Sequence, residues 1–188
     1  MFRCSLGDFS PSSVVHELGH WRGTFAMGTM TITELRRSLI LACPFFMPVQ
    51  KLDGAWLHPS RLPLGGGWDG HCSAPGHEGE RPSEQELHEF CNLGYAAKCS
   101  RLPSQRDCDA VRFTIARDQG SRLLVWFVCE TGHRPAEHGT LEYDVDRGTW
   151  MGAHSDPRIQ KMLDCYLQSY LQRRLQSAPA NSLARADL

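Results

Sequence analysis

The feature that most constrains the fold of this chain is a long run over residues 43–81, CPFFMPVQKLDGAWLHPSRLPLGGGWDGHCSAPGHEGER, which is rich in glycine, proline and histidine. It shows neither helical nor strand periodicity, and a stretch of this length without regular structure is uncommon inside a compact domain. Its aromatic side chains argue against disorder: Phe45, Phe46, Trp56 and Trp68. We therefore expect something other than helix or strand hydrogen bonds to hold this run in place.

Four cysteines mark this run and the segment after it: Cys43, Cys72, Cys91 and Cys99, spaced C-x28-C-x18-C-x7-C. Four thiolates can ligate one zinc ion or one iron–sulfur cluster, and the free energy of metal binding then contributes to folding. Cys91 and Cys99 would lie about 12 Å apart on one unbroken helix, so the break that Gly94 supplies is needed to bring both to one site. The sequence thus predicts a metal centre at these four cysteines.

The identity of the metal depends on weaker signals. Zinc sites usually contain a C-x2-4-C pair, which this chain lacks. Cys43 is followed directly by proline, like the last cysteine of the bacterial ferredoxin pattern, so a [4Fe–4S] cluster is favoured over zinc. The loop RLPLGGGWDGHC could offer backbone N–H groups to the cluster sulfurs, with Trp68 shielding one side, which points to a redox-active cluster.

Three alternatives to a four-cysteine centre stay open. One histidine could replace a cysteine in a Cys3His zinc site, and the candidates are His71, His77 and His88. The four cysteines could instead be small buried apolar residues, since free cysteine is among the most buried residue types. They could also form disulfides, although a reducing compartment disfavours these.

The rest of the chain is predicted to hold helices and strands. Helical patterns cover residues 31–41, 82–94 and 156–176, and strand patterns cover 110–117, 122–130 and 139–150. Ser83 and Glu86 form a capping box for the second helix, and Asp156 with Pro157 begins the third. The middle strand is apolar on both faces, as expected for a central position. These patterns predict an α+β fold with an irregular cysteine-held lobe, followed by a three-stranded antiparallel sheet packed by a long C-terminal helix.

The domain organisation follows from the same patterns. Residues 1–30 are predicted to be a weakly ordered leader, and 177–188 a frayed tail. Between them, 31–176 is predicted to be a single α+β domain. It divides into a cysteine-rich lobe, 31–108, and the sheet with its helix, 109–176.

Charge and hydropathy limit the expected partners. The chain has 20 Lys and Arg against 21 Asp and Glu, so it gives no electrostatic case for binding nucleic acid or an anionic membrane. No run approaches the ~20 apolar residues of a membrane span, and the apolar stretch before Cys43 is too short for a secretion signal. We therefore expect a cytoplasmic protein with a protein partner, for which Trp56 and Trp68 are the candidate contacts.

A different chemistry is suggested near the start of the chain. The segment HELGH matches H-E-x-x-H, in which two histidines (here His16 and His20) hold zinc while the glutamate, Glu17, acts as general base. The third histidine of the longer form of this motif would fall at position 26, which is Ala26. Glycines and threonines that follow the motif also break its helix. A zinc-dependent hydrolase is therefore kept as an alternative.

Several segments together resemble an uncharacterised family of bacterial proteins with a four-cysteine motif: CPFFMP, LHPSRLPLGGGWDGHCSAPG, FCNLGYAAKCSRLP, DAVRF and HGTLEYD. The resemblance covers roughly residues 31–176 and excludes HELGH. It implies that the cysteines act as one set, and it implies no reaction. The sequence thus favours a non-enzymatic metal- or iron–sulfur-binding protein, acting in redox sensing, electron transfer or interaction, with a structural protein-interaction module as a further alternative.

Overall fold

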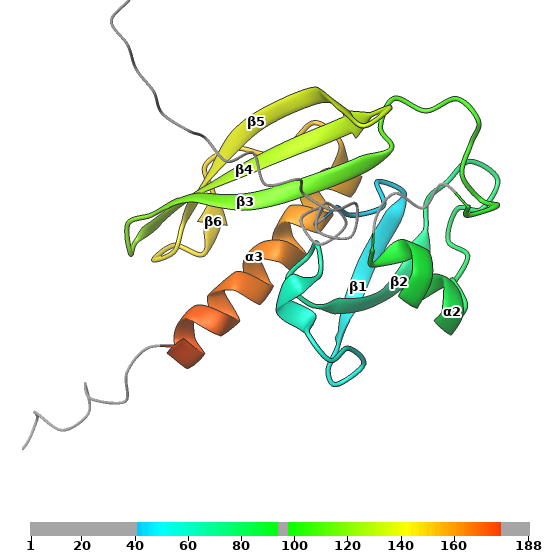
Figure 1. The fold of residues 1–188 in the computed structure, drawn as a ribbon. Helices are drawn as coiled ribbons and strands as arrows, with labels where there is room; N and C mark the ends of the chain where they lie inside the picture. Colours follow the sequence, from blue (N-terminus) through cyan, green and yellow to red (C-terminus); the bar gives the residue numbers. More distant parts are fainter. Residues whose placement is uncertain (1–40, 94–97, 178–188) are drawn as a thin grey trace, which may run out of the picture. The chain divides into compact units, whose positions relative to one another are not determined.

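The computed structural model of the chain describes residues 41–93 and 98–177 (Figure 1). These residues form a two-stranded sheet, a short helical segment, a four-stranded sheet and a long C-terminal helix, so the predicted α+β class is confirmed. The predicted leader, the HELGH motif and the helix predicted over 31–41 lie outside the described residues, apart from Leu41.

A hairpin occupies much of the run that we expected to be irregular: β1 (Phe46–Leu52) pairs antiparallel with β2 (Gly67–Cys72). The expectation was wrong because two sequence signals hid these strands. Pro48 lies inside β1, and its missing N–H is tolerated because both strands of a two-stranded sheet have a free edge. Gly70 is needed in β2, since a Cβ at this position would come 2.1 Å from the carbonyl oxygen of Met47.

The hairpin is joined to the rest by two short helical stretches. A 3-10 turn, η1 (Pro59–Arg61), lies between the strands, and α2 (Glu84–Glu86) continues into a π-helical turn, η2 (Leu87–Cys91). The predicted capping box is confirmed. The Ser83 hydroxyl accepts the N–H of Glu86 (3.2 Å), while the Glu86 carboxylate accepts the N–H of Ser83 (2.7 Å).

A four-stranded antiparallel sheet follows in the order β3 (Ala110–Asp118), β4 (Arg122–Thr131), β5 (Arg134–Asp144) and β6 (Thr149–Trp150) (Figure 1). The central position predicted for β4 is confirmed, but the predicted number of three strands is wrong. The single strand expected over 139–150 is divided, because the chain turns at Gly148, which has a φ of 67°. The alternating pattern runs through Val145 and Asp146, past the end of β5 at Asp144, and so concealed the break.

The C-terminal helix, α3 (Pro157–Ser177), was predicted from its apolar stripe. The Asp156 carboxylate accepts the N–H of Arg158 (2.8 Å) and so caps the helix, as predicted. Its buried side chains are Ile159, Met162, Leu163, Cys165, Leu167 and Ser169. The helix packs against β1 and β3. None of the helices in residues 41–93 and 98–177 is long and apolar enough to cross a membrane.

One hydrophobic core joins the hairpin, the sheet and α3. Its largest fully buried side chains include Trp68 and Phe46 from the hairpin, Val125 from β4 and Met162 from α3. The cysteine-bearing segments are therefore positioned by the same core that orders the sheet.

Candidate metal centre

The structure brings the four predicted ligands, Cys43, Cys72, Cys91 and Cys99, to the wall of one cavity. The first precedes β1, the second ends β2, the third ends η2, and the fourth lies in the loop before β3. The hairpin register pairs Phe46 with Cys72 and so sets the end of β2 beside the chain that leads from Cys43. The cavity has a volume of about 20 Å³, which is room for about one water-sized species.

The wall around the sulfurs is mostly apolar, with one cation. Phe45, Phe46, Phe90 and Leu102 contribute rings and aliphatic carbon. Arg101 also lines the cavity, and its guanidinium pairs with the carboxylates of Glu80 (3.2 Å) and Glu86 (3.0 Å). Burial opposes the charge of Arg101, but these carboxylates outweigh it, so its pKa lies above the usual value.

Burial keeps at least two of the thiols neutral. Burial, with smaller effects from the neighbouring sulfurs of Cys99 and Cys72, raises the pKa of Cys43 to about 12. The pKa of Cys91 is raised by burial and then by Cys43, Cys99 and Cys72. The four sulfurs are thus electrostatic neighbours, and their thiolate forms need a cation beside them to become favourable.

The sulfurs share the cavity without forming a ligand shell. Within residues 41–93 and 98–177, no three His, Cys, Asp or Glu side chains are arranged to hold a metal ion. Neutral thiols do not attract one another, so the metal itself would have to draw them together as it displaces their protons. The residues therefore fit a metal by donor type and location. Cys91 and Cys99 are half-buried, whereas Cys43 and Cys72 are buried.

The histidines considered as substitutes for a cysteine lie elsewhere. His71, His77 and His88 are not among the described residues that line the cavity. The His88 ring stacks on Trp56, with 4.3 Å between centroids, and His77 Nδ1 lies 3.0 Å from a Glu80 carboxylate oxygen. The structure therefore places no histidine where a Cys3His site would need one.

The triple-glycine loop does not serve the cavity as we expected. A Cβ at Gly65 would meet the Arg173 side chain, and one at Gly67 would meet the ring of Trp56, so these glycines permit packing contacts. Trp68 is buried in the core and does not line the cavity. The N–H groups that do bond these sulfurs come from elsewhere: Ala74 donates to Cys72 Sγ (3.4 Å), and the backbones of Phe45 and Phe46 bond Cys43 and lower its pKa. This loop therefore gives no support for a redox-active cluster.

Sequence reasoning missed Arg101 as part of this site. Its only local signal was its position two residues after Cys99, and its contacts depend on helix α2, which lies far away in sequence. The histidines and glutamate of HELGH lie outside the described residues. Comparisons of the chain with models of protein families, with curated proteins and with solved structures found no match.

Proposed function

We propose that this chain is a non-enzymatic metal-binding protein in which Cys43, Cys72, Cys91 and Cys99 ligate one centre, a [4Fe–4S] cluster or a single zinc ion. The observation that carries the proposal is that four cysteines from four separate segments line one cavity. Four thiolates complete the ligand set of either centre. The resemblance to bacterial proteins with a four-cysteine motif points to the same set.

Two charged side chains lie in the cavity wall, Arg101 and Glu86, and Arg101 pairs with Glu86 and with Glu80. Four thiolates outweigh the charge of a divalent zinc ion or of a cluster core, so the charge of Arg101 favours the bound centre and that of Glu86 opposes it. A zinc ion would supply structural stability alone, whereas a cluster would supply electron transfer. Because binding displaces thiol protons, metal affinity should increase with pH.

The first test is the composition of protein purified without oxygen. Elemental and sulfide analysis should find either about one zinc, or about four iron and four sulfide, per chain. The cluster form should be brown and should bleach with dithionite, while the zinc form should be colourless. Protein that contains no metal, and that takes up neither zinc nor iron with sulfide, would overturn the proposal.

The second test compares two buried cysteines. Cys91→Ser should lose the metal and unfold at a lower temperature, because ligation and folding are linked. Cys165→Ser is the matched control, since Cys165 is buried on α3, does not line the cavity, and has its pKa raised to about 12 by burial. Full metal content in Cys91→Ser would show that the ligand set is wrong.

The third test concerns the cation. Arg101→Met should weaken metal binding by about tenfold or more in competition with a chelator, as is typical when a group that supports the ligands is removed. Arg81→Met is the control, because Arg81 has a side chain that is 76% exposed and pairs with Asp69 outside the cavity wall. Equal affinity in both variants would contradict the role assigned to Arg101.

A further inference from the structure

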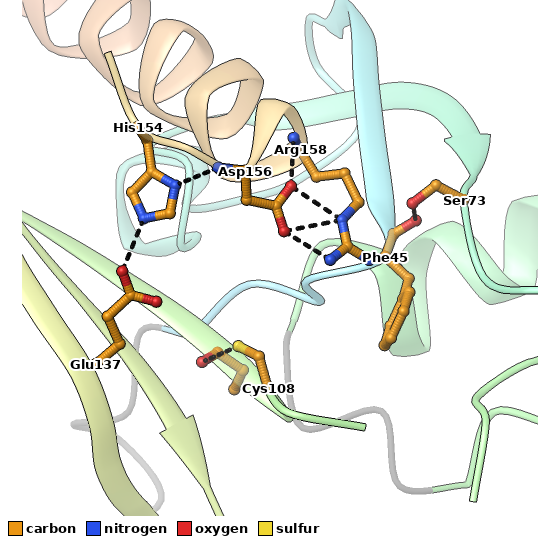
Figure 2. A network of polar contacts seen from close by, with 8 residues as sticks. Phe45, Ser73, Cys108, Glu137, His154, Asp156 and Arg158 are labelled. Carbon is orange, nitrogen blue, oxygen red and sulfur yellow. Dashed lines mark hydrogen bonds and ion pairs between the residues drawn. The ribbon is translucent and has the colours of Figure 1, made fainter. Parts of the chain in front are cut away.

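A second pocket, with a volume of about 380 Å³, shares Phe45 with the four-cysteine cavity but is lined by other chemistry. It lies where the approach to β3, strands β4 and β5, and the start of α3 meet. Its wall includes two cysteines that the metal proposal does not use, Cys108 and Cys129, together with His154 and Arg158. Figure 2 shows how Cys108, His154 and Arg158 lie in this region.

The two cysteines lie on paired segments and line the same pocket. Val111 pairs with Cys129, and the N–H of Asp109 donates to the carbonyl of Glu130 (2.7 Å), so the segment before β3 is held along β4. The Cys108 thiol donates to the carbonyl of Ala110 (3.3 Å). An interaction between the Cys108 and Cys129 side chains is the largest cause of the shifts of both, and it lowers the pKa of Cys108 and raises that of Cys129. One cysteine is thus favoured as the thiolate nucleophile, and the other as the thiol beside it.

Positive charge and an unused donor complete the pocket. The Arg158 guanidinium is held by the Asp156 carboxylate (2.6–3.1 Å) and lies 5.0 Å from the centre of the Phe45 ring. Its charge interacts with the Cys108 sulfur, which favours the thiolate.

His154 carries the unused donor. Its side chain is 4% exposed, and its Nδ1 accepts the N–H of Asp156 (2.9 Å), so Nε2 carries the proton of the neutral ring. Nε2 lies 3.4 Å from a Glu137 oxygen, but no described group hydrogen-bonds it. A buried N–H without such a partner, in the wall of a pocket, is available to a small polar ligand.

We propose that Cys108 and Cys129 form a redox-active dithiol that a small peroxide oxidises to a disulfide within this pocket. The Cys108 thiolate attacks one oxygen of hydrogen peroxide, the O–O bond breaks, and the leaving hydroxide takes up a proton to become water. Cys108 is then a sulfenic acid. The Cys129 sulfur attacks it, the S–O bond breaks, and the departing hydroxide takes the Cys129 proton as a second water. Two thiols and one peroxide thus give one disulfide and two waters.

The geometry favours this pairing over others. Because the two side chains line one pocket and interact with each other, side-chain rotation can bring their sulfurs to the S–S bond length of about 2.05 Å. Cys165 lies on α3 outside this pocket, and burial keeps it a neutral thiol. The proposal is independent of the metal centre, since the two sets share no cysteine.

The test uses the full chain as purified, treated with a few equivalents of hydrogen peroxide, then alkylated, digested without reduction and mapped by mass spectrometry. We expect a peptide pair joined by Cys108 and Cys129 that dithiothreitol releases. It should form at least about tenfold faster than any oxidation of Cys165, because oxidation follows thiolate character. Metal content is measured before and after, so that loss of the metal centre is recognised separately.

Two variants test which cysteines form the disulfide. Cys129→Ser should stop at the sulfenic acid on Cys108, which dimedone traps, whereas Cys165→Ser should still form the disulfide. The proposal is overturned if wild-type Cys108 stays reduced at peroxide levels that oxidise Cys165. It is also overturned if Cys108 pairs with another cysteine, such as Cys43, while the metal content is unchanged.

Discussion

Asn92 is a buried amide, 2% exposed, that ties the helical segment to the hairpin. Its Oδ1 accepts the N–H of Trp68 (2.9 Å), and its Nδ2 donates to the carbonyl of Trp68 (3.0 Å), as a neighbouring strand would. Nδ2 also donates to the carbonyl of Leu87 (3.1 Å), but that oxygen accepts the backbone N–H of Asn92 as well (3.2 Å). Removing the side chain therefore takes one hydrogen bond each from the Trp68 N–H, the Trp68 carbonyl and the Leu87 carbonyl. Only the Leu87 carbonyl then keeps another of the partners described here, the N–H of Asn92.

We predict that Asn92→Ala destabilises the fold strongly. The N–H and the carbonyl of Trp68 lose the hydrogen bonds that Asn92 makes. Each buried polar group that loses its hydrogen bond costs about 1–3 kcal/mol, so the free energy of unfolding should fall by about 2–6 kcal/mol. For a domain of this size, a loss of about 4 kcal/mol lowers Tm by about 8–16 °C. Because Asn92 follows Cys91, metal content should fall with stability.

The assay is thermal and urea unfolding followed by circular dichroism. Gln85→Ala is the matched control, since the Gln85 amide donates to Glu89 (3.1 Å) on the exposed face of the helical segment. This variant should stay within about 0.5 kcal/mol of the wild type. A loss below about 1 kcal/mol for Asn92→Ala, or one equal to that of the control, would refute the reasoning.

Asn92→Asp tests the same contacts by charge. The carboxylate still accepts the Trp68 N–H, but its second oxygen faces two carbonyls that it cannot hydrogen-bond when ionised. Burial raises the folded-state pKa of such an acid above its unfolded value of about 3.9. The deficit relative to the wild type should therefore be smallest below about pH 4 and grow as pH rises toward the folded-state pKa. A deficit that is independent of pH would contradict this account.

Two further predictions concern the lobe that carries the cysteines. The hydrogen bond from the N–H of Ser83 is the largest cause that lowers the pKa of Glu86. This carboxylate therefore contributes stability at pH values above its unfolded-state pKa, and the contribution is lost as pH falls. Glu86→Gln should flatten the acid side of the stability–pH curve, measured by urea unfolding. Gly70→Ala should cost about 1–3 kcal/mol or more, because the new Cβ would lie 2.1 Å from the Met47 carbonyl oxygen. Gly152→Ala, whose Cβ would come no closer than 3.9 Å to its nearest neighbour, should change thermal stability by less than about 0.5 kcal/mol, and similar losses at both glycines would contradict the packing argument.

Local patterns in the sequence were enough to predict α3, its cap at Asp156, the capping box at Ser83 and the central place of β4. These features depend on neighbours a few residues apart, so periodicity and capping chemistry report them directly. The hairpin escaped prediction because Pro48 and Gly70 are poor strand formers in isolation. They are suited to β1 and β2 only by a free edge and by a close backbone approach.

The residues of the two sites were likewise predicted from sequence only in part. The sequence identified the four cysteines as a set by residue type and context, but their approach to one cavity depends on the register of β1 with β2 and on the way Asn92 ties η2 to the hairpin. The interaction of Cys108 with Cys129 had no sequence signal, since 20 residues separate them and the register of β3 with β4 brings them together. Strand register is a property of pairing between distant segments, and spacing along the chain does not encode it. The sequence by itself thus determined the local elements and the kinds of ligand, while the tertiary structure alone decided which side chains meet.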